Sequence, residues 1–216
     1  MGEDTLLSFV QNELQIVVLI IFGTLYAVKA YQISRRPAPP QGGVPRAGIL
    51  GGVAKSYGMT FVPWMMESSR THLGRWLEYA VYHLGAGSAI AATFLFPFAP
   101  SWMVPWVRYT FLVFIALASV VGVIKIVRRF TRPELRVIST LDDYFSLISL
   151  EIWLLTAIPA MTLNRTGMIV FFIITAGFLL YVPFSKISHY VYWFFARFLF
   201  GVKFGRRGVV PRSGGA

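Results

Sequence analysis

Long apolar runs separated by short polar segments dominate the pattern along this chain of 216 residues. Five runs are long enough to cross about 30 Å of hydrocarbon as helices, at about 1.5 Å per residue. No helical repeat period or low-complexity tract appears in the sequence. The pattern therefore predicts an all-α integral membrane protein with a single bundle of five transmembrane helices, near residues 8–29, 77–98, 106–126, 143–163 and 167–188.

The segments outside these runs have a different composition. The connector RRPAPPQGGVPRAGILGG is rich in proline and glycine, which is typical of an irregular segment. VAKSYGMTFVPWMMESSRTHLGRW mixes apolar and polar residues, and VYWFFARFLFGVKFGRRGVVPR combines aromatic residues with cations, as segments along a membrane surface do. The predicted organisation is a first transmembrane helix in 1–30, a cytoplasmic loop in 31–75, a four-helix region in 76–200 and a basic tail in 201–216.

Composition and charge support a membrane protein and orient it. The chain is 56% hydrophobic and only 13% charged, and its net charge of +11 comes from basic residues in the gaps after the first, third and fifth runs. The positive-inside rule then predicts that the N-terminus lies outside and the C-terminus in the cytoplasm of a multi-pass protein of the cell (inner) membrane. A basic groove with exposed aromatic residues is missing from the pattern, which argues against nucleic-acid binding.

The chain has no cysteine, and this limits its cofactor chemistry. A disulfide framework, thiolate-ligated iron–sulfur clusters and covalently attached haem are all excluded within this chain. Any redox group held here needs other ligands.

Histidines are the candidate ligands. His72 lies in the predicted loop and is interpreted as a surface residue. His83 and His189 lie in or at the edge of apolar runs, on helices of opposite direction and both in the cytoplasmic half of the membrane. Ionisable side chains are costly there and indicate function by default. Two neutral imidazoles on different helices are what axial ligation of a b-type haem requires.

The segment YHLGAGSA after His83 adds small residues, with Gly85 and Gly87 leaving room for a flat macrocycle against the helix. An alternative remains open at this point. The glycines can instead serve helix packing, and each histidine can be an interhelical hydrogen-bond donor.

Two longer segments carry a family resemblance: VGVIKIVRRFTRPELRVISTLDDYFSLISL, and later GFLLYVPFSKISHYVYWF. Its motifs are the basic RR-F-x-R-P-x-x-R turn, Asp143 at the start of the fourth run, and the P-F-S-[KR]-x-x-H sequence that ends the fifth run. Over about residues 70–195 the chain resembles the gamma subunit of respiratory nitrate reductases, a cytochrome b membrane anchor. The same domain recurs in anchors for heterodisulfide-reductase-like iron–sulfur subunits. The resemblance implies five spans, an outside N-terminus and, in the family, four histidines for two stacked b haems.

Carried over by position, the resemblance makes His83 and His189 the iron ligands of the haem nearer the cytoplasm. The positions of the other two family ligands are occupied here by Thr93 and Phe171, neither of which serves as an axial base. One haem b is therefore expected, on the cytoplasmic side, with the outer haem lost. Since the family's quinone site lies beside the outer haem, the place of any quinone site becomes uncertain.

Further residues are expected to support the haem or move protons. Lys186 and Arg132 are candidate partners of the haem propionates, alongside Gly87 as the place where the macrocycle lies; these cations can instead set topology and bind lipid headgroups. Glu151, in SLISLEIWLLTA, is the only acid near the middle of a run. Burying its charge costs several kcal/mol, so it is a candidate proton carrier for a quinone, or forms a structural hydrogen bond to another helix.

The expected function is a haem b-containing membrane subunit of a respiratory oxidoreductase complex. It would pass electrons between the quinone pool and a cytoplasmic iron–sulfur subunit, with membrane lipid around it and no substrate-converting site of its own beyond quinone oxidation or reduction. A haem-free structural anchor for a catalytic subunit is the main alternative. A small transporter or channel is the other, and it predicts a polar stripe through several helices.

Overall fold

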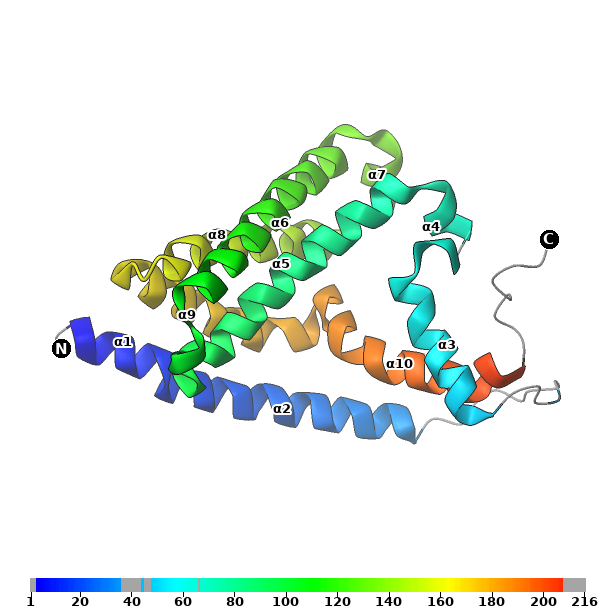
Figure 1. Ribbon diagram of the computed structural model, residues 1–216, viewed down its shortest axis with the longest axis horizontal. Helices are drawn as coiled ribbons and strands as arrows, with labels where there is room; N and C mark the ends of the chain where they lie inside the picture. The colour runs from blue at the N-terminus through cyan, green and yellow to red at the C-terminus, as the bar shows by residue number, and fades with distance from the viewer. Residues whose placement is uncertain (1–2, 36–43, 45–47, 66, 208–216) are drawn as a thin grey trace. The chain divides into compact units, whose positions relative to one another are not determined.

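The computed structural model describes residues 3–35, 44, 48–65 and 67–207 (Figure 1). Every regular element within these residues is helical, which confirms the predicted all-α class. Among the described residues, five helical stretches are long and apolar enough to span a membrane, as the run lengths predicted. The chain is therefore a multi-pass membrane protein, with its candidate spans at Asp4–Ser34, Leu73–Phe98, Pro105–Thr131, Leu141–Met161 and Arg165–Phe184.

The elements of these spans and their connectors follow one another along the chain. The first span consists of α1 (Glu3–Gln11) and α2 (Glu13–Ser34), and the next four are built on α5 (Leu73–Phe98), α6 (Pro105–Thr131), α8 (Leu141–Met161) and α9 (Arg165–Tyr181). The remaining helices are α3 (Ile49–Phe61), η1 (Pro63–Met65), α4 (Glu67–Thr71), η2 (Pro100–Trp102), α7 (Pro133–Ile138), η3 (Val182–Phe184), η4 (Lys186–Ser188), α10 (His189–Lys203) and η5 (Gly205–Arg207).

The chain divides into two compact units, which are described one at a time. The first contains the residues up to Val28 together with Glu78–Ile187, and we call it the bundle unit. The second contains Lys29–Leu77 and the chain from Ser188 onward, and we call it the second unit.

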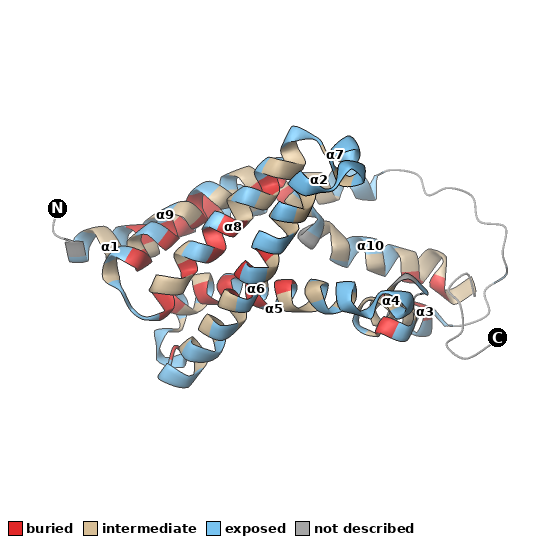
Figure 2. Cartoon of the chain, turned by 90° about the horizontal axis from the view of Figure 1, so that it is seen from above, coloured by how far each residue is buried: buried red, intermediate tan, exposed pale blue. Residues whose placement is uncertain are grey.

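Close packing of small residues around a few large ones forms the core of the bundle unit. α8 packs on both α6 and α9. Buried positions gather along α8 and α9 in Figure 2, and Leu154, Phe171 and Phe172 are completely buried. Alanines with no exposed surface let the helices approach one another, which matters because van der Waals packing drives helix association in lipid; they are Ala89, Ala92, Ala118, Ala157 and Ala160.

A buried glutamine ties the first span to the bundle. Gln15 is 2% exposed, and its Nε2 donates to the carbonyl of Val10 at 3.1 Å and to that of Phe172 at 2.8 Å. The first bond crosses the break between α1 and α2, and the second reaches α9. One amide side chain therefore holds the two pieces of this span against the fifth.

The fifth span ends earlier than its apolar run. The run extends to residue 188, but α9 ends at Tyr181 and the span at Phe184. Pro183 has no N–H to donate to the carbonyl four residues back, so the α-helix does not continue through it. Two short 3₁₀ turns follow, and His189 begins the separate helix α10.

In the second unit α3 packs against α10, as Figure 1 shows. Glycines allow the close approach, because a Cβ on Gly52 would lie 2.5 Å from the carbonyl oxygen of Gly201. Two hydrogen bonds fix the pair: Ser56 Oγ donates to the carbonyl of Arg197 at 2.8 Å, and Tyr57 Oη to that of Phe194 at 2.7 Å. These two segments, predicted from their composition to be interfacial, therefore form one packed element.

Candidate functional site

His83 lies on an exposed face of α5 in the bundle unit. Its Nδ1 is 2.8 Å from the carbonyl oxygen of Tyr79, one turn earlier, and the two rings are 4.0 Å apart. Because a carbonyl only accepts, Nδ1 carries the proton in this bond, and in the neutral ring the lone pair lies on Nε2. Ligating histidines typically have this arrangement, in which a hydrogen bond from one nitrogen orients the ring and sets the tautomer.

The two glycines near His83 have different roles. Gly87, one turn further on the same side of α5, is exposed, and a Cβ placed there would meet nothing within 4 Å. Gly85 is buried, and a Cβ there would collide with the Cβ of Ala118 and the carbonyl of Phe114 on α6. The expectation that both glycines leave room for a macrocycle therefore fits Gly87, whereas Gly85 serves helix packing.

His189 is the first residue of α10 and is exposed. It belongs to the second unit, whereas His83 belongs to the bundle unit. His72, interpreted as a surface residue, is exposed, and its Nδ1 lies 2.9 Å from the hydroxyl of Thr71.

The cations expected near haem propionates have protein partners. Lys186 Nζ lies 2.7 Å from Asp143 Oδ2 and 2.9 Å from Thr140 Oγ1. The same Asp143 closes the capping box at the start of α8 with Thr140, so the ammonium group completes a helix N-terminus. Arg132 lies 3.7 Å from Glu134, and its side chain is 55% exposed. Both side chains are about half exposed, so the two cations differ mainly in the length of their ion pairs.

The two positions where the family would place its outer ligands are occupied by structural side chains. Thr93 Oγ1 donates to the carbonyl of Ile90 at 2.7 Å, within its own helix. Phe171 is completely buried, with its ring 6.0 Å from that of Trp153 and 5.4 Å from that of Phe172. Packed aromatic rings therefore fill this part of the bundle core.

A group of charged residues marks one end of the bundle unit, which we call the basic end. Arg128 at the end of α6 makes a bidentate pair with Glu78 on α5, at 2.8 and 3.0 Å. Next to it, Arg129 lies 3.5 Å from Asp143. Antiparallel helices bring these residues together. The Glu78–Arg128 pair was not predicted from the sequence; an acid at the start of one apolar run and arginines at the end of the next are the pattern that could have indicated it.

Glu151 lies on α8 and is 4% exposed, deep inside the bundle unit. It faces α6, because its Oε2 lies where a Cβ on Gly122 would be. Neither carboxyl oxygen has a hydrogen-bond partner of normal geometry among the described residues, although the Ser119 hydroxyl lies beside the carboxyl. The sequence alone indicated that Glu151 is unusual, because it is an acid within an apolar run. Its contact with Gly122 could not be predicted from the sequence, because it depends on how α6 and α8 pack.

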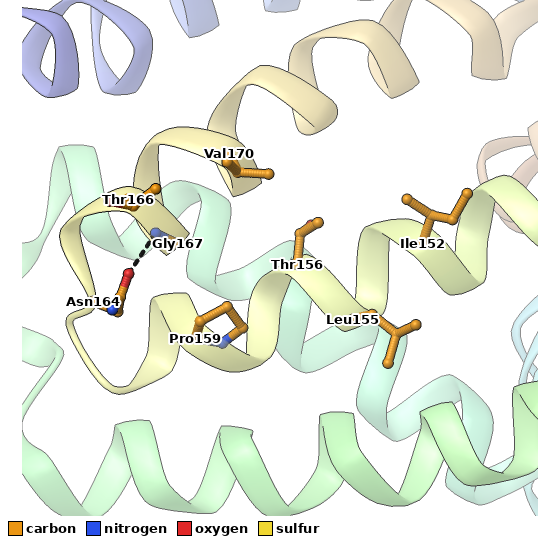
Figure 3. Close-up of a pocket in the computed structure, with 8 residues that line it drawn as sticks. All are labelled: Ile152, Leu155, Thr156, Pro159, Asn164, Thr166, Gly167 and Val170. Carbon is orange, nitrogen blue, oxygen red and sulfur yellow. Dashed lines mark hydrogen bonds between the residues drawn. The ribbon is translucent and has the colours of Figure 1, made fainter.

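An open groove of about 420 Å³ lies between the second half of α8 and the start of α9 (Figure 3). Two of its polar side chains are already used: Thr156 donates to the carbonyl of Trp153, and Asn164 caps α9 by accepting from the N–H of Gly167. We assign no ligand to this groove, which is lined by Ile152, Leu155, Thr156, Pro159, Asn164, Thr166, Gly167 and Val170.

Comparisons with known proteins give no family, and the described residues give no metal cluster. Within the described part of the chain, no group of three or more His, Asp or Glu side chains is placed to hold a metal ion. No family model matches the sequence, and neither a curated protein nor a solved structure is significantly similar to it.

Proposed function

We propose that this multi-pass protein is a haem b-binding subunit of a respiratory oxidoreductase complex in the cell (inner) membrane. It resembles the nitrate reductase gamma subunit in its motifs, and its role would be electron transfer between the quinone pool and a cytoplasmic iron–sulfur subunit. The observation that supports this best is the His83 face of α5. There an oriented imidazole, with its lone pair on Nε2, lies one turn from the open surface at Gly87.

The proposed cofactor is one haem b. The resemblance assigns His83 and His189 as its iron ligands, and the bound group would supply one-electron transfer. Tyr79 keeps the His83 ring in one orientation through its carbonyl, and Gly87 leaves the adjacent helix surface flat. Lys186 is paired with Asp143 at 2.7 Å and Arg132 with Glu134 at 3.7 Å, so Arg132, with the longer ion pair, is the better supported partner for a propionate. The buried Phe171 supports the expectation of one haem, since its ring fills core volume near the position of a second ligand.

A haem-free structural anchor is the second candidate. The observation in its favour is that Lys186 makes a salt bridge that completes the α8 N-terminus, so this cation already has a structural role without any cofactor. The anchor would tether the same class of cytoplasmic subunit through its basic surface.

A reduced-minus-oxidised optical spectrum of the purified full chain separates the two candidates. The proposal predicts the absorption bands of a b-type haem, with the same bands developing when a short-chain quinol is added as the reductant. No haem band in chains purified from cells that make haem would reject the proposal and favour the anchor. If dithionite reduces the haem but quinol does not, the result would support the haem as cofactor and exclude the quinone as its redox partner.

A further inference from the structure

Three buried polar side chains meet without normal hydrogen bonds in the bundle unit. They are Tyr82 on α5, Ser119 on α6 and Glu151 on α8, which are 6%, 5% and 4% exposed. The phenol oxygen, the serine hydroxyl and both carboxyl oxygens all lack hydrogen-bond partners of normal geometry within the described residues. Buried polar atoms in proteins nearly always have a partner, so such a group indicates water, an ion or a functional proton at the place where they meet.

Gly122 provides the space for this meeting. A Cβ there would collide with Glu151 Oε2 and lie 3.2 Å from Cε2 of Tyr82. The carboxyl and the phenol ring therefore both rest on the one position of α6 that lacks a side chain. Ser119 is one turn away on the same helix, beside the carboxyl.

Polar groups continue from this cluster toward the basic end. Lys125 Nζ lies 3.7 Å from the centre of the Tyr82 ring, in cation–π contact. The Glu78–Arg128 pair follows, within electrostatic range of Lys125. On α6 these positions form one row of residues three apart, Ser119, Gly122, Lys125 and Arg128, in which neighbours lie next to one another on the helix surface.

The opposite direction is closed by apolar packing. Ile115 lies one turn from Ser119 on α6, and Leu154 lies three residues beyond Glu151 on α8. Both are completely buried, as are Ala118 and Ala157. Among the described residues, α6 and α8 present only apolar side chains there, and the hydroxyl of Ser88 on α5 already donates to the carbonyl of Leu84, so a chain of water molecules is poorly supported on that side.

We propose that Glu151, Ser119 and Tyr82 form a hydrated proton-binding site, which exchanges protons with the basic end alone, past Lys125 and the Glu78–Arg128 pair. A hydronium ion arriving from that end gives its proton to the Glu151 carboxylate, leaving a carboxylic acid and water, and the reverse step releases it. Tyr82 is the titratable group in electrostatic contact with the carboxyl, and Lys125 lies over the ring of Tyr82. The site does not depend on bound haem, so its test is independent of the test of the proposed function.

Infrared spectroscopy of the full chain in lipid nanodiscs tests the site directly. A protonated carboxylic acid has a C=O stretching band apart from the amide bands, and the band moves when the proton is replaced by deuterium. Glu151→Gln is expected to remove one such band and Glu151→Asp to shift it. Circular dichroism of each variant verifies that the helices are retained.

The rate at which this band shifts after transfer to D₂O tests the route. Lys125→Met is expected to slow the exchange by about tenfold, equivalent to about 1.4 kcal/mol on the barrier. Lys203→Met is the matched control, because this lysine lies on α10 in the second unit, and it should leave the rate unchanged.

Two results would overturn the proposal. If no acid band is lost in Glu151→Gln at any pH at which the protein stays folded, Glu151 does not bind a proton. If the band is present but Lys125→Met and Lys203→Met exchange at the same rate as the unaltered chain, the route past Lys125 is wrong.

Discussion

Trp153 and Glu151 lie two residues apart on α8 and are 3% and 4% exposed, yet their surroundings differ completely. Trp153 faces α9, where its ring stacks on Phe178 at 5.5 Å and its Nε1 donates to Thr175 Oγ1 at 2.8 Å. Glu151 faces Gly122 of α6, and its carboxyl oxygens lack normal hydrogen bonds among the described residues. Positions two apart on a helix point in directions about 200° apart, so α8 has two buried sides.

The two sides of α8 show two kinds of buried residue. Trp153 is buried with its polar atom satisfied, whereas Glu151 is buried with its carboxyl oxygens unsatisfied by the described residues. On the α9 side the polar atoms of Trp153 and Thr175 satisfy each other, and Thr175 also donates to the carbonyl of Phe171. On the α6 side, packing makes room for a carboxyl that stability alone does not require. His83 directly follows Tyr82 on α5 but points about 100° away from it, to the exposed face of the helix, whereas Tyr82 is buried.

The largest stability effect is expected on the α9 side. Trp153→Ala removes a completely packed ring and leaves the Thr175 hydroxyl without its donor, which should lower the free energy of unfolding by about 3–5 kcal/mol. Trp102→Ala is the control, because this tryptophan is 70% exposed and should change stability by less than about 0.5 kcal/mol. Unfolding in mixed detergent micelles, followed by circular dichroism, measures both, and equal losses would show that the α9 side is not the better packed one.

A smaller loss is expected at the floor of the Glu151 site. Gly122→Ala places a methyl group against Glu151 Oε2 and Tyr82, and overpacking of this kind costs about 1–3 kcal/mol. Gly177→Ala is the matched control, because a Cβ there meets nothing within 4 Å and alanine favours the helix. The same unfolding assay compares the two variants. A Gly122→Ala protein as stable as the Gly177→Ala protein would mean that the carboxyl does not rest on Gly122.

The smallest effect should have the opposite sign. Glu151→Leu replaces an unpaired buried carboxyl by an apolar side chain of similar size, which should raise the free energy of unfolding by about 1 kcal/mol. Glu78→Leu is the control, because removing this acid leaves Arg128 without its bidentate partner and should lower stability. A loss for Glu151→Leu comparable to that of Trp153→Ala would give Glu151 a structural role and erase the difference between the two sides.

The sequence predicted the spans well, because the length of an apolar run is a local property. All five predicted runs correspond to helices of membrane-spanning length. The end of the fifth was placed too late, since the apolar composition continues past Pro183 although the α-helix cannot. The sequence also indicated which residues need a functional or structural explanation, because an acid or a histidine within an apolar run is unusual.

The partners of these residues could not be read from the sequence, because they depend on how the helices are rotated. Gly85 and Gly87 look equivalent in YHLGAGSA, but they point in directions about 200° apart, one into α6 and the other to open space. The salt bridge of Lys186 with Asp143 joins residues 43 positions apart. The contact of Lys125 with the Tyr82 ring also needed the packing of α5 on α6.

The haem content per chain, measured as the pyridine haemochrome in the unaltered protein and in histidine variants, tests the central claim most directly. The account predicts one haem b per chain, its loss in both His83→Ala and His189→Ala, and its retention in His72→Ala. Haem retained at the same stoichiometry in both ligand variants, or two haems per chain in the unaltered protein, would contradict it.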